Sequence, residues 1–344
     1  MERFDLNTCA KVKEWLQKDV KKIVIIPHVN PDGDAIGSAL GLNDIFNNAG
    51  FESNVVVPND FPSYLTWLGS GGIPMIYEQS TEQCQRLIDQ ADALFFLDFN
   101  DVKRLGKLEE YLSSNTKPVV LIDHHPDPII KADFMFSDTD VSSTAELVYD
   151  FIDALGMLDH ITLAGANALL TGIIADTGSF SHNASRPDMY HIVGELIKRG
   201  ADKNKINESL FNDFSEKRMR LLGYCLSKKM ELYPQYRTAL IWLSAEELKR
   251  FDFHPGDTEG FVNYPLSIKG IVFSAFFMEK HDYVKISFRS KGSFATNDFS
   301  GDHFSGGGHR NASGGETKLS MKEALALFRE LLPQYSERLE SDFL

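Results

Sequence analysis

Residues 23–34 read Ile-Val-Ile-Ile-Pro-His-Val-Asn-Pro-Asp-Gly-Asp, a short apolar run followed by a polar segment. Its four branched apolar residues, Ile23 to Ile26, are typical of a strand buried on both faces, which shows no polar alternation. The next segment, Ala35 to Ala49, predicts a helix that ends at Gly50. A short buried strand that leads through a polar turn into a helix is the repeating unit of a parallel α/β sheet.

The alternation of strand and helix continues through the first half of the chain. We expect further strands at 54–57, 93–97 and 119–122, and helices at 81–90, 142–155 and 161–175. Ser143 and Glu146 have the spacing of a capping box at the start of one of these helices. The pattern predicts an α/β fold with a doubly wound parallel sheet.

The 344 residues suggest two domains. We expect a catalytic domain at 1–190, a helical connector at 191–228 and a smaller α+β domain at 229–344. In the last region, 270–277 and 283–290 predict a hairpin, and Ser320 and Glu323 cap a final helix to about Leu332. We expect the active site in the cleft between the two domains.

Composition narrows the function classes. The formal net charge is -14, whereas a protein that grips long nucleic acid usually carries a broad basic face. Three scattered cysteines fit a reducing compartment, and neither a signal peptide nor a stretch of about 20 apolar residues is visible. We therefore expect a cytoplasmic protein that binds neither membranes nor long nucleic acid, with a homodimer as one option for its assembly.

Polar residues follow the expected strands at the edge where parallel sheets bind ligands. After Ile26 come His28, Asp32 and Asp34, with Gly33 expected to let the loop turn tightly. The strands at 93–97 and 119–122 and the helix at 161–175 are followed by Asp98, by Asp123-His124-His125 and by Asp176, respectively. A lone aspartate after a strand is usually a helix cap or loop residue, so the inference depends on the whole set occurring together.

The mixture of carboxylates and imidazoles has a chemical reason. Crowded ionised carboxylates repel one another and need a cation. Oxygen ligands with a few imidazoles suit Mn²⁺ or Mg²⁺ better than a thiolate site would. Two such ions, about 3.5–4 Å apart, can clamp a phosphoryl group and generate a hydroxide nucleophile.

These residues resemble the four motifs of the DHH phosphoesterase superfamily. The resemblance implies hydrolysis of phosphoester or phosphoanhydride bonds with two Mn²⁺ ions, for which Mg²⁺ could substitute. It implies one ion held by His28, Asp32 and Asp98, and another held by Asp34, Asp98, His124 and Asp176. It also implies that His125 polarises the scissile phosphate and that Asp123 orients a ligand histidine.

A glycine-rich stretch near the end forms a second constellation. Gly306, Gly307 and Gly308 precede His309 and Arg310, and Arg289 ends an expected strand upstream. Glycines let backbone amides approach an anion, and a guanidinium is a good phosphate ligand. Alone, such a stretch is as often a flexible surface loop. It resembles the DHH-associated C-terminal domain, although the two alanines usual in that signature are Ala312 and Ser313 here.

With two short domains and no large insertion, the chain most resembles the nano-RNase A branch of the superfamily. This resemblance implies a hydrolase of short RNA or DNA oligonucleotides that also converts 3′-phosphoadenosine 5′-phosphate to AMP. Hydrolysis of pyrophosphate, polyphosphate or a cyclic dinucleotide stays open. A non-catalytic nucleotide-binding module would predict a broken ligand set, but this set is complete. The length and acidic balance disfavour a processive RecJ-type exonuclease.

Overall fold

The structure is a computed structural model that describes residues 3–254 and 256–340. It divides into two compact units, Met1–Asp213 and Phe214–Leu344, and each is described by itself. The segment expected to connect the domains, 191–228, contains most of α7 (Pro187–Lys198) and all of α8 (Lys203–Phe211) and α9 (Glu216–Lys228). Within the described residues, no helix is both long and apolar enough to cross a bilayer.

The first unit contains a six-stranded, fully parallel sheet with the order β3-β2-β1-β4-β5-β6. Its strands are β1 (Lys22–Pro27), β2 (Glu52–Val57), β3 (Met75–Ile76), β4 (Ala93–Leu97), β5 (Val119–Asp123) and β6 (Phe134–Ser137). The order runs one way from β1 to β3 and the other way from β4 to β6. Ligands bind beyond the carboxyl ends of the strands at such a reversal, which here lies between β1 and β4.

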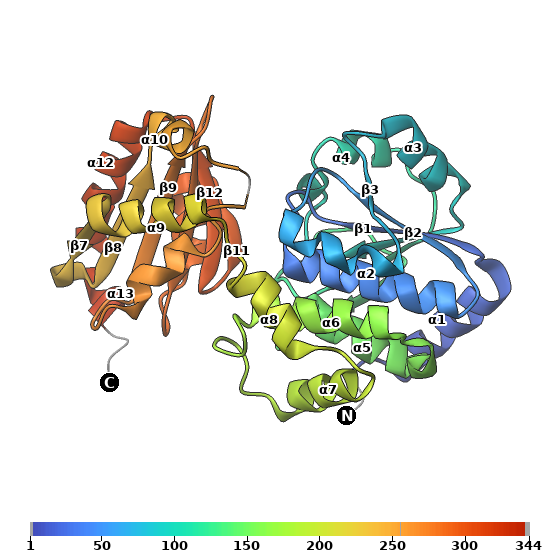
Figure 1. Cartoon of the computed structure of the whole chain (residues 1–344). Coiled ribbons are helices and arrows are strands. Elements are labelled where there is room, and N and C mark those ends of the chain that lie inside the picture. Colours follow the sequence, from blue (N-terminus) through green and yellow to red (C-terminus); the bar gives the residue numbers. More distant parts are fainter. Residues whose placement is uncertain (1–2, 255, 341–344) are drawn as a thin grey trace. The chain divides into compact units, whose positions relative to one another are not determined.

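Helices cover both faces of this sheet, which confirms the doubly wound fold (Figure 1). Helices α3 (Thr81–Gln90) and α4 (Leu108–Leu112) pack on one face. The other core holds α7, α8 and four further helices: α1 (Leu6–Asp19), α2 (Gly33–Asn48), α5 (Thr144–Ala154) and α6 (Leu163–Asp176). Three 3-10 helices, η1 (Ser63–Gly71), η2 (Val102–Leu105) and η3 (Leu158–His160), also belong to this unit.

Helices α2 and α6 pack unusually closely because both carry small residues at the contact. A Cβ added at Gly37 would lie 2.5 Å from the Ala168 carbonyl oxygen and 2.7 Å from the Gly172 nitrogen. A Cβ at Gly33 would overlap that of Ala175. Our expectation that Gly33 permits a tight turn was wrong: it is the first residue of α2 and lacks a left-handed backbone, so its smallness serves helix packing.

The second unit is built on a mixed sheet with the order β11-β12-β10-β9-β8-β7, in which only β8 and β9 pair in parallel. Its strands are β7 (Met230–Tyr233), β8 (Thr238–Leu243), β9 (Phe273–Glu279), β10 (Val284–Ser290), β11 (Gly307–His309) and β12 (Ala312–Thr317). The predicted hairpin is confirmed as β9 and β10, and the predicted capping box at Ser320 and Glu323 is present.

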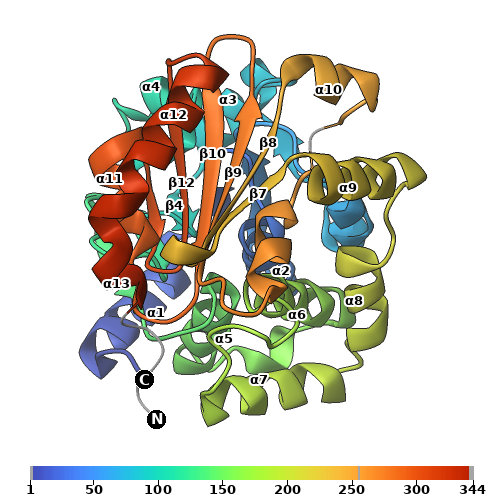
Figure 2. The same cartoon turned by 90° about the vertical axis from the view of Figure 1, so that its left-hand side faces the viewer.

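Figure 2 shows the helices of this unit on the two sides of its sheet. A phenylalanine-rich core lies under α11 (Thr296–Phe304), α12 (Met321–Leu331) and α13 (Ser336–Glu340). The opposite face is covered by α9, α10 (Ala245–Arg250) and η5 (Phe261–Ser267). Two short turns, η4 (Pro234–Tyr236) and η6 (Leu332–Tyr335), complete the unit.

Candidate active site

The first unit brings the six candidate metal ligands together at the carboxyl edge of its sheet. His28 follows β1, Asp98 follows β4 and His124 follows β5. Asp32 and Asp34 lie at the start of α2, and Asp176 ends α6. Two groups of side chains each place their nearest nitrogen and oxygen atoms within 4.8 Å of one another: His28 with Asp32 and Asp98, and Asp34 with His124 and Asp176.

Asp98 belongs to the first group and also lies close to His124 of the second. Its Oδ2 lies 3.4 Å from His28 Nε2, and its Oδ1 lies 3.5 Å from His124 Nε2. The Thr144 hydroxyl donates a hydrogen bond to the same Oδ1 at 2.9 Å. Asp98 is 2% exposed and has a left-handed backbone with φ 68°. A non-glycine residue seldom adopts that conformation unless the surrounding structure holds it there.

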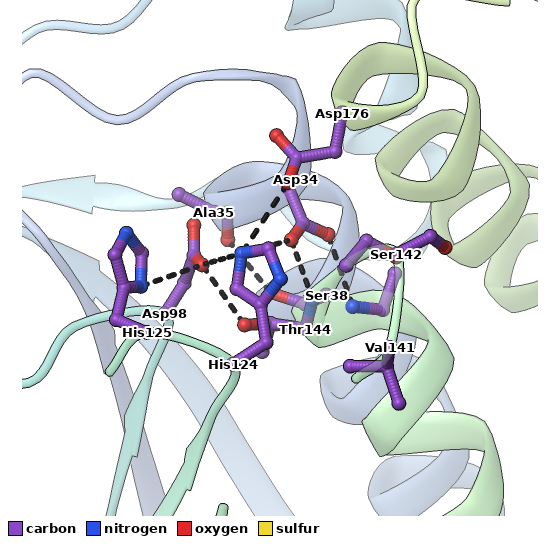
Figure 3. Close-up of polar contacts among 12 residues, drawn as sticks. Asp34, Ala35, Ser38, Asp98, His124, His125, Val141, Ser142, Thr144 and Asp176 are labelled. Atoms are coloured by element: carbon purple, nitrogen blue, oxygen red, sulfur yellow. Dashed lines mark hydrogen bonds and ion pairs between the residues drawn. The ribbon is translucent and has the colours of Figure 1, made fainter. Parts of the chain in front are cut away.

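Asp34, His124 and Asp176 form the second group, and Figure 3 shows their side chains pointing toward one another. His124 Nε2 lies 3.3 Å from Asp176 Oδ2 and 3.9 Å from Asp34 Oδ2. The Asp34 carboxylate accepts the backbone N–H groups of Thr144 at 2.6 Å and Ala145 at 3.0 Å. These amides belong to the first turn of α5, where unpaired N–H groups and the helix dipole favour an anion.

Burial and crowding shift the protonation of these groups in different directions. Burial, together with the charges of Asp98 and Asp176, raises the pKa of Asp34 well above its usual value. Burial acts in the same direction on Asp98, but the surrounding histidines outweigh it and lower the pKa of that carboxyl. Burial lowers the pKa of His124, which keeps a neutral imidazole available as a ligand.

The residues present fit a divalent cation. His28 Nε2 is buried and makes no hydrogen bond within the described residues, since its neighbour Asp98 Oδ2, at 3.4 Å, does not meet hydrogen-bond geometry. Such an orphaned nitrogen is costly unless something binds it. Carboxylate oxygens with a few imidazoles are the donors that Mn²⁺ and related ions accept. The arrangement can therefore hold metal at the carboxyl edge of the sheet.

His125 is held from both sides of its ring. Its Nδ1 contacts Asp123 Oδ1 at 2.7 Å, and Arg104 Nη1 contacts its Nε2 at 2.9 Å. Since a guanidinium can only donate, the network assigns Nε2 as the acceptor and places the ring proton on Nδ1, which donates to Asp123. Asp123 thus orients His125 within this network.

Sequence reasoning missed Arg104 and Thr144. Arg104 lies in η2, six positions after Asp98, and its carbonyl also accepts the Val29 N–H at 2.6 Å. Nothing in the sequence separates it from the neighbouring Lys103. Thr144 reads as an ordinary first-turn helix residue, although its amide and hydroxyl contact two candidate ligands. Only their position in the sequence could have indicated a role for these two residues, since both adjoin loops at the edge of the sheet that carries the candidate ligands.

The second unit arranges its candidate residues on a three-strand patch. In the register of the sheet, Ala312 pairs with His309 on one side and with Arg289 on the other. Directly paired residues share a face, so Arg289 and His309 lie on one face two strands, or about 10 Å, apart. Arg310 donates two hydrogen bonds to the Ser293 carbonyl, which ties it to the preceding loop.

The three glycines before His309 differ in what they require. A Cβ at Gly306 would overlap the Gly314 carbonyl oxygen and the Ser300 hydroxyl. Gly308 has φ 133°, a conformation that side chains rarely adopt. At Gly307 a Cβ would meet no atom within 4 Å. Packing therefore explains Gly306, backbone conformation explains Gly308, and neither explains Gly307.

Comparison with protein-family models gives two matches. Residues 22–173 match the DHH family, N-terminal domain, and residues 239–336 match the DHHA1 domain. The first match ends before α7 and begins after α1. The two matched segments thus fall in separate units of the structure.

Similar proteins cover most of the chain. A Thermus thermophilus protein named bifunctional oligoribonuclease and PAP phosphatase NrnA is 30% identical, over 89% of this chain and 87% of its own. A crystal structure of an exopolyphosphatase-related protein from Bacteroides fragilis is 41% identical with a TM-score of 0.92, over 98% of both chains. RecJ from Thermus thermophilus, in complex with Mn²⁺, shares the fold at 15% identity and a TM-score of 0.54, over 97% of this chain and 54% of RecJ.

Proposed function

Because the chain belongs to the DHH family, and is therefore a phosphoester hydrolase, we propose that it cleaves short oligonucleotides to mononucleotides and 3′-phosphoadenosine 5′-phosphate to AMP. One observation carries the proposal that two metal ions take part: the two oxygens of Asp98 face different imidazoles, His28 and His124. In that position Asp98 would help to hold both ions of a two-metal hydrolase.

We assign one ion to His28, Asp32 and Asp98, and the other to Asp34, Asp98, His124 and Asp176. Mn²⁺ is the proposed ion, with Mg²⁺ as a substitute, because the donors are oxygens and imidazoles. Bound there, the ions would supply a Lewis acid for the phosphoryl oxygens and lower the pKa of a coordinated water.

The protein's own side chains would prepare the substrate for attack. The amides of Thr144 and Ala145 fix Asp34, and the Thr144 hydroxyl fixes one oxygen of Asp98. Asp123 holds His125 in one orientation, and Arg104 adds a positive charge beside it. We propose that the Arg104 guanidinium contacts the phosphoryl oxygens and stabilises the charge that develops on them, and that His125 joins it once Arg104 turns to the substrate and a proton on His125 Nε2 makes that nitrogen a donor.

The second unit supplies the proposed contacts to the rest of the nucleotide. Arg289 and His309 share one face of the β10, β12 and β11 strands, and Gly307 leaves room for a ligand against its backbone. A net charge of -14 leaves few cations for a long chain of phosphates, which favours a short substrate. A cytoplasmic location and a homodimer remain predictions from the sequence.

Hydrolysis of polyphosphate or pyrophosphate is the second candidate, because a 41%-identical relative is described as exopolyphosphatase-related. A cyclic-dinucleotide hydrolase is the third member of this group of functions. All would use the same metal site. They differ in whether a nucleoside must be held at a distance from the cleaved bond.

A turnover panel with purified protein and Mn²⁺ tests the proposal. It should contain a phosphorylated RNA dinucleotide, a long RNA strand, 3′-phosphoadenosine 5′-phosphate, cyclic di-AMP, pyrophosphate and polyphosphate. We expect the highest kcat/KM on the dinucleotide and the bisphosphate, with turnover lost on chelation and best restored by Mn²⁺. A clear preference for the long strand or for polyphosphate would overturn the proposed substrate class, and full turnover in chelator would overturn the metal site.

A further inference from the structure

We propose that Arg3 is a positioning residue of the metal site, which fixes the first turn of α5 and thereby the backbone amides that hold Asp34. The inference deepens the proposed function and rests on its metal site. Arg3 lies outside the segment that matches the DHH family, which begins at residue 22.

Arg3 joins three carboxylates that are far from it in the sequence. Its Nε lies 2.5 Å from Asp150 Oδ2, its Nη1 lies 2.5 Å from Asp138 Oδ2, and its Nη2 lies 3.5 Å from Glu146 Oε1. The Arg3 side chain is only 14% exposed. Since Asp138 follows β6 whereas Glu146 and Asp150 lie on α5, the guanidinium ties the loop before α5 to the helix itself.

Glu146 carries this constraint toward the start of the helix. Its side chain is fully buried, and its Oε2 accepts both the Ser142 N–H at 2.9 Å and the Ser142 hydroxyl at 2.8 Å. The predicted capping box was therefore half wrong: Ser143 does accept the Glu146 N–H, but the Glu146 carboxylate binds Ser142 instead of returning to the Ser143 amide. Glu146 therefore fixes Ser142, which is two residues before Thr144, whose backbone N–H binds Asp34.

A second guanidinium completes the cluster. Arg186 Nη1 lies 3.2 Å from Glu146 Oε1 and donates to the Asp140 carbonyl at 2.8 Å. Two guanidiniums therefore face three carboxylates around residues 138–150. Removing Arg3 would leave a buried Glu146 and a half-buried Asp150 with one cation, and a buried charge that loses its partner is strongly unfavourable.

The constrained segment leads directly to the metal site. Thr144 and Ala145 donate their amides to Asp34, and the Thr144 hydroxyl donates to Asp98 (Figure 3). A shift of this turn moves donors on both proposed ligands at once. Groups that orient metal ligands typically change metal affinity by about 10- to 100-fold when they are lost. Arg3 acts one contact further out, so we expect the lower end of that range.

The test compares Arg3→Ala and Arg3→Lys with Lys18→Ala. Lys18 is a matched control, because its side chain is 66% exposed and its ion pair is with Glu14, one turn away on α1. Mn²⁺ binding is measured directly by the electron paramagnetic resonance of free Mn²⁺, and amide hydrogen exchange is followed for the peptide that contains residues 141–147. Melting temperatures are recorded for all variants.

We expect Arg3→Ala to weaken Mn²⁺ binding about 10-fold and to speed exchange at Thr144 and Ala145. Arg3→Lys should be intermediate, because an ammonium cannot reproduce the three-way contact of a guanidinium. It carries the test alone if Arg3→Ala does not fold. Lys18→Ala should match the wild type in both measurements.

A lower melting temperature with unchanged Mn²⁺ binding and unchanged exchange at residues 141–147 would overturn the proposal, since Arg3 would then only stabilise the fold. Wild-type protein that binds no Mn²⁺ would instead overturn the metal site on which the inference rests. The two failures are distinguishable because hydrogen exchange needs neither metal nor substrate.

Discussion

The metal cluster of the first unit and the three-strand patch of the second, formed by β10, β12 and β11, show two ways in which a chain prepares a site. The cluster gathers ligands from four separate parts of the chain, and His28, Asp34, Asp98 and His124 are each at most 5% exposed. The patch takes Arg289 from β10 and His309 from β11, which both pair with β12, and both side chains are partly exposed. Buried charges depend on one another for their ionisation. The ionisation of exposed charges depends less on their neighbours. We therefore expect a substitution in the patch to change ligand binding and to leave the rest of the protein unaltered.

The largest effect should come from breaking the cluster. Asp98→Asn keeps the shape of the side chain but removes the charge shared by both proposed ions. We expect a loss in kcat of more than about 10³-fold, beyond the usual cost of removing one electrostatic stabiliser. Turnover of a dinucleotide and of bis-p-nitrophenyl phosphate measures it, with metal content determined in parallel. Activity close to that of the wild type would exclude Asp98 from the site.

A smaller effect on turnover should follow from substitutions in the three-strand patch. Arg289→Ala or His309→Ala removes one charge-assisted contact, worth roughly 1.5–3 kcal/mol, so KM for a dinucleotide should rise by about 10- to 150-fold. If that contact also positions the reacting phosphate, kcat will fall as well. On bis-p-nitrophenyl phosphate, which lacks the remote nucleotide, both variants should keep most activity. Equal loss on both substrates, with metal content intact, would contradict the difference between the two regions.

The close contact of α2 and α6 allows a test of how tightly the cluster is packed. A Cβ at Gly172 would lie 2.6 Å from Asp34 Oδ1 and from the Ala145 Cβ. Gly172→Ala should therefore cost about 1–3 kcal/mol of unfolding free energy through overpacking, and it should lower activity. Gly194→Ala is the control, because that exposed position in α7 has no atom within 4 Å of a new Cβ. It should gain up to about 1 kcal/mol in helix propensity. Urea unfolding measures both.

The smallest effect should come from Gly307→Ala. A Cβ at Gly307 would meet no atom within 4 Å, so the melting temperature of this variant should equal that of the wild type within the error of the measurement. If backbone amides there bind a phosphate closely, KM for a dinucleotide should rise by a few-fold, because the methyl blocks the approach. Gly308→Ala should instead lower the melting temperature, since Gly308 has φ 133°. An unchanged KM for Gly307→Ala would indicate that the ligand does not contact this turn.

Much of the fold follows from the sequence because local patterns determine it. The expected bounds of α3 and β4 coincide with the observed ones, and the residues after β1, β4 and β5 lie together at the reversal of strand order. Contacts that depend on tertiary structure could not be predicted. Arg3 is 147 positions from Asp150, and Gly33 is small because of Ala175. The edge strands β3 and β6 were missed, since neither continues the long apolar runs of the central strands.

The left-handed backbone of Asp98 bears on the choice of an inactive enzyme for trapping substrate in crystals. At φ 68°, asparagine and aspartate are the non-glycine residues best tolerated. Asparagine at position 98 would abolish the charge and leave the loop undisturbed, whereas alanine would combine loss of a ligand with strain of roughly 1 kcal/mol or more. A complex captured with the asparagine variant would thus report the resting geometry of the bound nucleotide, free of a displaced loop.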